Sequence, residues 1–296
     1  MSDQISFDAL LPPAMAAKAE DLGVKKANLN AVNMFMLAVL AGAFIGIGAI
    51  FATTVAAGGM SVTDAAGTAA FKTGLPYGVT RLLVGLVFTV GLILVVVGGA
   101  ELFTGNTLIT MAYASKKVTL GQLLRNWGIV YVGNFVGSIL TALIVFLGKQ
   151  YTFGTGAIGL AVLNIAESKT ALAFIQAVAL GIMCNALVCM AVWMCYSART
   201  TTDKILAIIP PISCFVAAGF EHSVANMYFI PIGLFVKYFG DASFFEKIGK
   251  TAADFPTLTW GNLFLKNLLP VTIGNIIGGA IMVGLVYWFV YNRKTK

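Results

Sequence analysis

The chain alternates between long apolar stretches and short polar segments. The apolar stretches cover approximately residues 33–57, 80–114, 124–147, 170–198, 205–238 and 263–291. Most of them reach the roughly 20 residues that an α-helix needs to cross a bilayer. The pattern therefore predicts an all-α integral membrane protein with six transmembrane helices, preceded by a polar N-terminal segment at 1–30.

The second and fifth stretches are too long for one straight crossing, and they contain related sequences. Residues 99–106 read Gly-Ala-Glu-Leu-Phe-Thr-Gly-Asn, and residues 219–226 read Gly-Phe-Glu-His-Ser-Val-Ala-Asn. An ionisable residue midway along an apolar helix is costly and is usually functional. We expect each stretch to form two half-helices, joined by unwound backbone that is buried in protein or lines a cavity.

A second pattern repeats between the two halves of the chain. Residues 133–137 and residues 274–278 both read Gly-Asn-x-x-Gly, in the third helix of each half. The halves at 33–147 and 170–291 each contain three helices, and an odd number of crossings inserts them in opposite directions. The prediction is a single transmembrane domain over 1–296, built as an inverted repeat with broken helices 2 and 5.

The composition excludes several classes of protein. Hydrophobic residues make up 59% of the chain and charged residues 10%, too few polar side chains to cover a soluble globule. The net charge of +7 is not gathered on one basic face, so we expect no nucleic-acid partner. The four cysteines have no Cys-x-x-Cys spacing and read as buried thiols, so we predict no metal site and no cofactor.

Basic residues between the apolar stretches predict the orientation in the membrane. With the N-terminus inside, the inner segments hold eleven of the nineteen Lys and Arg residues, and the polar start shows no secretory signal. We therefore expect both termini in the cytoplasm. The N-terminal segment should form a helix that starts near Pro12 and Pro13 and ends at Gly23. It would be an anchor at the lipid interface or a gate over the inner mouth.

His222 is the only histidine, and it lies in the second break beside Glu221. With a reference pKa of ~6.5, it is the one side chain here that readily exchanges a proton near neutral pH. Thr104 offers a hydroxyl at the place where His222 would lie across the pseudo-two-fold axis. The alternative for Thr104 is a hydrogen bond to its own helix.

The carboxylates in the breaks need a structural explanation, because in an anion pathway they would repel the solute. We expect Glu101 and Glu221 to cap the half-helices that follow them. We expect nearby asparagines to bind the freed backbone; these are Asn106, Asn226, Asn134 and Asn275. Lys169, at the start of the fourth stretch, would be an interfacial anchor or would concentrate anions in a vestibule.

Bulky apolar residues cluster around the breaks. Most such residues are packing, but a few can form hydrophobic constrictions that exclude hydrated ions. The candidates are Phe88, Leu92, Phe103, Val188, Phe215 and Phe220.

Over essentially its whole length the chain resembles the formate/nitrite transporter family. The most specific segments are residues 99–104, 219–226 and 270–279, and residues 7–16 and 192–197 are similar to bacterial formate channels. The resemblance implies an aquaporin-like six-helix protomer, a homopentamer with one pore per protomer, and passage of small monovalent anions or their acids through the bacterial inner membrane.

The resemblance also implies roles for individual residues. Thr104, His222 and Asn185 would be the polar residues of the pore centre, and Lys169 would be the vestibule cation. The inner constriction would be formed by Leu92 and Phe215 with Phe88 nearby, and the outer one by Phe103, Val188 and Phe220.

We therefore expect a formate channel with proton coupling, in which His222 passes a proton to formate so that neutral formic acid crosses the apolar ring. In a purely anionic alternative, His222 only donates a hydrogen bond. Residues 105–107 are similar to the nitrite branch, so nitrite or hydrosulfide are alternative solutes. Less favoured are a membrane enzyme, for which no motif is found, and a neutral-solute channel, for which no arginine is expected at the breaks.

Overall fold

The computed structural model describes residues 9–58, 62–63, 67–71 and 74–293. Within them, six helical segments are long and apolar enough to span a membrane, which confirms the predicted fold class. They are α2 (Ala31–Gly58), α3 (Tyr77–Gly98), α6 (Leu120–Leu147), α8 (Phe174–Ser197), α9 (Thr201–Ala218) and a last span, Trp260–Asn292.

Both predicted helix breaks are present. α3 ends at Gly99 and is followed by α4 (Phe103–Asn106), a 3₁₀ turn and α5 (Thr110–Ala114). α9 ends at Gly219 and is followed by α10 (Ser223–Phe239). The two glycines have φ of +74° and +80°, a left-handed conformation that ends a helix and that a side chain would strain. Each glycine thus turns the chain out of one half-helix at mid-span.

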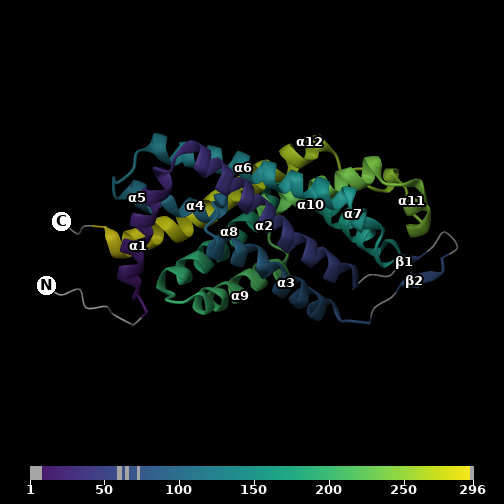
Figure 1. Ribbon diagram of the computed structural model, residues 1–296, viewed down its shortest axis with the longest axis horizontal. Helices are drawn as coiled ribbons and strands as arrows, with labels where there is room; N and C mark the ends of the chain where they lie inside the picture. The colour runs from purple at the N-terminus through teal and green to yellow at the C-terminus, as the bar shows by residue number, and fades with distance from the viewer. Residues whose placement is uncertain (1–8, 59–61, 64–66, 72–73, 294–296) are drawn as a thin grey trace.

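The remaining elements are short helices and one small hairpin outside the six spans. They are α1 (Pro12–Ala27), α7 (Ala157–Thr170), α11 (Ala242–Ile248), β1 (Val62–Thr63) and β2 (Ala69–Phe71). The last span contains α12 (Trp260–Asn262), α13 (Leu269–Ile276) and three π-helical segments. In Figure 1, α1 and α5 lie at one end of the long axis, and α11 and the β1–β2 hairpin lie at the other.

The Gly-Asn-x-x-Gly repeats bring helices into close contact in both halves. A Cβ at Gly137 in α6 would lie 1.9 Å from the carbonyl oxygen of Val39 in α2. A Cβ at Gly278 in the last span would lie 2.1 Å from the carbonyl oxygen of Ile182 in α8. Only glycine permits these approaches, as is typical of helix packing in lipid. The same packing is therefore used twice.

The repeat extends further than we expected, because α1 and α7 occupy matching positions. Lys26 is the next-to-last residue of α1, and Lys169 is the next-to-last residue of α7. The carbonyl of Lys26 accepts a hydrogen bond from Asn126, and the carbonyl of Lys169 accepts one from Asn267. α7 was not predicted, and Lys169 belongs to it and not to the fourth span, since α8 begins only at Phe174.

α1 packs on protein through much of one face. It starts at Pro12 as expected but continues past Gly23, which is buried, and a Cβ there would lie 3.0 Å from Cβ of Ala112. Glu20, also buried, pairs with Lys117 at 2.7 Å and accepts a hydrogen bond from Asn292 at 2.6 Å. Gly23 therefore serves close packing, not helix termination.

Candidate functional site

Two cavities enter the molecule from opposite ends. The α1-side cavity, about 350 Å³, is lined by α1 residues including Lys18 and Lys26 and by the C-terminal end of α3. The α7-side cavity, about 360 Å³, is lined by Lys169 of α7 and by the C-terminal end of α9. α3 and α9 thus end at opposite cavities, as an inverted repeat requires.

A small void of about 10 Å³ lies between the two cavities. Leu92 and Leu102 line both the void and the α1-side cavity, whereas Phe88, Phe215 and His222 line both the void and the α7-side cavity. Its volume is close to the roughly 10–15 Å³ that one water molecule needs. The other residues that line it are Ile45, Val188 and Ile212. The route between the cavities is therefore narrow and almost entirely apolar.

The predicted constriction residues are divided between these spaces. Phe88, Leu92, Val188 and Phe215 line the void, and the rings of Phe88 and Phe215 meet edge to face at 5.8 Å. Phe220 lines the α7-side cavity instead. Phe103 lines neither cavity nor the void but packs edge to face on Trp127 and Tyr131. Leu102 lines the void and the α1-side cavity in its place, because successive residues at the break point in different directions.

His222 and Thr104 meet across the pseudo-two-fold axis. His222 Nε2 lies 2.9 Å from Thr104 Oγ1, and both side chains are buried. His222 Nδ1 accepts the backbone N–H of Ala225 at 3.0 Å and so caps α10. Because Nδ1 is an acceptor, the proton of a neutral imidazole is on Nε2, the nitrogen that faces Thr104. The ring also stacks on Phe215, with centroids 5.9 Å apart.

Asn185 stabilises the contact between Thr104 and His222 by binding the backbone of Thr104. Its side-chain amide donates to the carbonyl of Thr104 at 3.2 Å and to the carbonyl of Asn275 at 2.7 Å. It is fully buried and does not line the void or either cavity. In this structure, therefore, Asn185 ties the short α4 to the last span and fixes the position of Thr104.

The break carboxylates bind side chains, not the backbone N–H groups that we expected. Glu101 pairs with Lys26 at 2.6 Å and accepts from Asn106 at 2.7 Å. In the second break, a lysine and an asparagine hold the carboxylate in the same way: Glu221 pairs with Lys169 at 2.7 Å and accepts from Asn226 at 2.6 Å. A buried carboxylate needs such partners. In the second break, the side chain that caps the following half-helix α10 is that of His222, not that of Glu221.

Asn134 and Asn275 bind the unwound backbone, as we expected. Asn134 accepts from the N–H of Phe103 and donates to the carbonyl of Glu101. Asn275 accepts from the N–H of Ser223 and donates to the carbonyl of Glu221. Each therefore supplies hydrogen bonds that the helix lost where it was broken. Asn106 and Asn226 instead serve the carboxylates.

Several residues of the cavities were not found from the sequence. Lys26 was counted only as an inner charge, and its link to Glu101 crosses 75 positions. Arg81 of α3 donates to the carbonyls of Val216 and Ala217, so an arginine does reach the second break, contrary to our expectation. Lys18 and Lys204 line the α1-side cavity. Burial, with nearby Lys204 and Arg199, lowers the pKa of Lys18.

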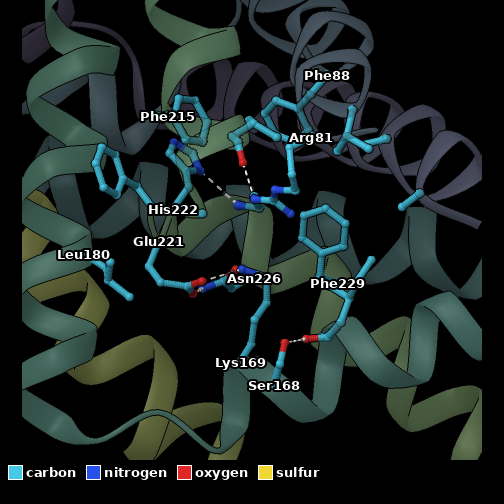
Figure 2. A pocket seen from close by; sticks show the side chains of 18 of the residues that line it. Arg81, Phe88, Ser168, Lys169, Leu180, Phe215, Glu221, His222, Asn226 and Phe229 are labelled. Atoms are coloured by element: carbon cyan, nitrogen blue, oxygen red, sulfur yellow. Dashed lines mark hydrogen bonds and ion pairs between the residues drawn. The ribbon is translucent and has the colours of Figure 1, made fainter. Parts of the chain in front are cut away.

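The chemistry of the site is that of a pathway for a small solute. Among the described residues, no group of three or more His, Cys, Asp or Glu side chains is placed to hold a metal ion. Of the described residues that line the void, His222 is the polar one, and its Nε2 contacts Thr104, which does not itself line the void. Figure 2 shows His222, Phe215 and Phe88 at one part of the α7-side cavity, with Lys169, Glu221 and Asn226 at another.

Comparisons with known proteins find relatives that match nearly the whole chain. The family model described as "Formate/nitrite transporter" matches residues 13–289. The formate channel FocA of Escherichia coli (strain K12) is 46% identical over 97% of this chain and 96% of its own. FocA of Haemophilus influenzae is 40% identical over 96% and 95%. A solved structure titled "Pentameric formate channel with formate bound" aligns with a TM-score of 0.81 at 44% identity, covering 89% of this chain and 98% of its own.

Proposed function

Because the chain belongs to the formate/nitrite transporter family, we propose that it moves formate across the bacterial inner membrane. The family is one of transporters, so an enzymatic role is set aside. We propose a homopentamer, like the pentameric formate channel with which the chain aligns. We propose a separate pathway in each protomer, because both cavities and the void lie within one chain. Both termini would face the cytoplasm, so that the α1-side cavity opens to the cytoplasm and the α7-side cavity to the exterior.

One observation carries this proposal: two cavities are separated by an apolar void to which, among the described residues, one imidazole contributes the polar group. Moving a bare carboxylate through an apolar space without hydrogen bonds is very costly. A donor at the narrowest point lowers that cost. His222 Nε2–H is such a donor, and formate, with its single carbon, is small enough to replace Thr104 as the partner of this N–H.

The finer part of the proposal is proton coupling through His222. For His222 to hand a proton to formate from Nε2 and remain neutral, Nδ1 must first gain a proton. Nδ1 would then become a donor and would lose the N–H of Ala225, which it accepts here at 3.0 Å. Proton transfer is therefore linked to the first turn of α10. In the anionic alternative, this hydrogen bond persists and His222 only donates.

The experiment is uptake into vesicles that contain the purified protein, assayed with formate, nitrite and hydrosulfide, with and without an inward proton gradient. Protein-free vesicles give the passive leak, and osmotic swelling in glycerol tests the neutral-solute alternative. We expect formate to enter fastest and the gradient to accelerate it. Faster entry of nitrite or hydrosulfide would reassign the solute, and no anion uptake above the leak would refute the proposal.

A further inference from the structure

Among the described residues, few charged side chains line the α7-side cavity. They are Arg81, Lys169 and Glu221. Lys169 Nζ lies 2.7 Å from Glu221 Oε1, so this pair contributes almost no net charge to the cavity. Lys169 is also close to the ring of Phe229, at 5.5 Å from its centroid. Lys169 is therefore a poor source of the field that would attract an anion from solution.

Arg81 differs from Lys169 because it pairs with backbone carbonyls and with no carboxylate of the described residues. Its Nε donates to the carbonyl of Ala217 at 3.0 Å, and its Nη2 donates to the carbonyl of Val216. Among the described residues, no acidic side chain lies within ion-pair distance of its guanidinium. Arg81 is half-buried, and it enters the pocket shown in Figure 2 from α3, whereas Lys169 enters it from α7. The net positive charge of this cavity is thus on Arg81.

The two carbonyls that Arg81 binds belong to the last turn of α9. The C-terminal end of a helix carries a partial negative charge of roughly half an elementary charge, on carbonyls that lack partners within the helix. Here that end faces the cavity through Val216 and Gly219. Left bare, it would repel an approaching anion. The guanidinium offsets it and leaves a surplus of positive charge.

We propose that Arg81 is the residue that attracts and orients the anion in the α7-side cavity, and that Lys169 chiefly neutralises Glu221. A guanidinium presents several N–H donors in a plane that matches a carboxylate, so it suits formate as well as other small oxyanions. This inference rests on the proposed anion transport and assigns one step of it, the capture of the anion from the external solution.

The α1-side cavity is arranged differently. Its Lys26–Glu101 pair matches the Lys169–Glu221 pair, but its surplus charge is on Lys18 and Lys204. For the last turn of α3, the described residues provide no side-chain donor that corresponds to Arg81. The two cavities therefore attract anions through different residues. Salt added on one side of the membrane should screen only the charges of the cavity on that side.

The test uses right-side-out membrane vesicles from a host without its own formate channels. Initial uptake is measured at subsaturating formate while an impermeant salt is raised from 0.01 to 0.5 M on one side only, with osmolarity held constant by sucrose. The screening length falls from roughly 30 Å at 0.01 M to a few ångströms near 1 M. The variants are Arg81→Gln, Arg81→Lys and the control Lys247→Gln, which removes an exposed charge of α11 outside the cavity.

In the wild type, external salt should slow uptake on the order of threefold to tenfold, as expected for a charge that concentrates its substrate. Arg81→Gln should start at the slowed rate and respond little to external salt, whereas Arg81→Lys and Lys247→Gln should respond like the wild type. Internal salt should affect every variant equally.

A wild-type response to external salt in Arg81→Gln would overturn the inference. So would an equal, salt-independent loss in Arg81→Gln and Arg81→Lys, which would make Arg81 only a cap for α9. If Arg81→Gln does not assemble, a wild-type that ignores external salt would overturn it just as clearly. If the wild type takes up no formate at all, it is the proposed function that fails.

Discussion

The break at residues 99–106 and the break at residues 219–226 have the same contacts with their surroundings. In each, the backbone N–H of the glutamate donates to a carbonyl of the first long helix of the same half. Glu101 binds Leu37 of α2, and Glu221 binds Leu180 of α8. In each, a lysine from the preceding short helix pairs with that glutamate, and an asparagine from the third helix binds the unwound backbone. The two halves therefore hold their broken helices by one common set of interactions.

The difference lies in which side chains enter the pathway. At the residue after the glutamate, the first break has Leu102 and the second has His222. Two residues later, the first break has Thr104 and the second has Val224. Thr104 and His222 then meet at 2.9 Å, although each occupies a position that is apolar in the other half. The repeat supplies a scaffold, and the departures from the repeat supply the polar contact at its centre.

The lysine–glutamate pairs give the largest expected effect. The Lys169 side chain is 15% exposed and that of Lys26 is 30% exposed, with glutamates 6% exposed in both pairs. Breaking a buried pair leaves an uncompensated charge and costs about 3–5 kcal/mol, and less where water reaches it. Lys169→Met should therefore lower the melting temperature in detergent more than Lys26→Met. Adding Glu221→Gln to Lys169→Met should restore much of the loss. A loss that the second substitution deepens would contradict the pairing.

The asparagine braces should be equivalent, with a smaller effect. Asn134→Leu and Asn275→Leu each leave a buried N–H and two carbonyls without their partner, at roughly 1–3 kcal/mol for each unsatisfied group. We expect similar drops in melting temperature for both variants. Asn262→Leu, a control on the half-buried start of the last span, loses only one side-chain bond. A large drop for one brace alone would show that the two breaks are not held alike.

Thr104 should have the smallest effect on stability and a moderate one on transport. Thr104→Val keeps the shape but leaves His222 Nε2 without its 2.9 Å partner, whereas Thr104→Ser keeps a hydroxyl. We expect formate uptake to fall about tenfold in the valine variant, equivalent to about 1.4 kcal/mol, and to stay near wild type in the serine variant. Equal rates in the two variants would show that the hydroxyl does not take part.

Much of this architecture was predictable because it depends on short sequence patterns within single segments of the chain. Long apolar stretches gave the six spans, Gly-x-Glu gave the breaks at Gly99 and Gly219, and Gly-Asn-x-x-Gly gave the close contacts of the third helices. The proximity of Thr104 and His222 followed from the inverted repeat alone.

What was missed depends on long-range contacts or on side-chain direction. α7 contains Asn164, Glu167 and Lys169, so its apolar run is too short to register as a span. Arg81 lies 136 positions from the carbonyl of Ala217, and no local pattern connects them. Phe103 and Leu102 are adjacent, and which of them lines the void is decided by the unwound backbone between two half-helices. Such directions cannot be read from helical periodicity where the helix is broken.

The pH dependence of formate uptake in wild type and His222→Asn tests the central claim most directly, because His222 is the titratable side chain that lines the void. Asparagine can donate a hydrogen bond but cannot supply a proton near neutral pH. We predict that wild-type uptake rises as the external pH falls and that His222→Asn, folded and assembled as judged by its melting temperature and gel filtration, loses this dependence. An unchanged pH profile in His222→Asn, with proton-driven uptake intact, would contradict proton transfer through His222.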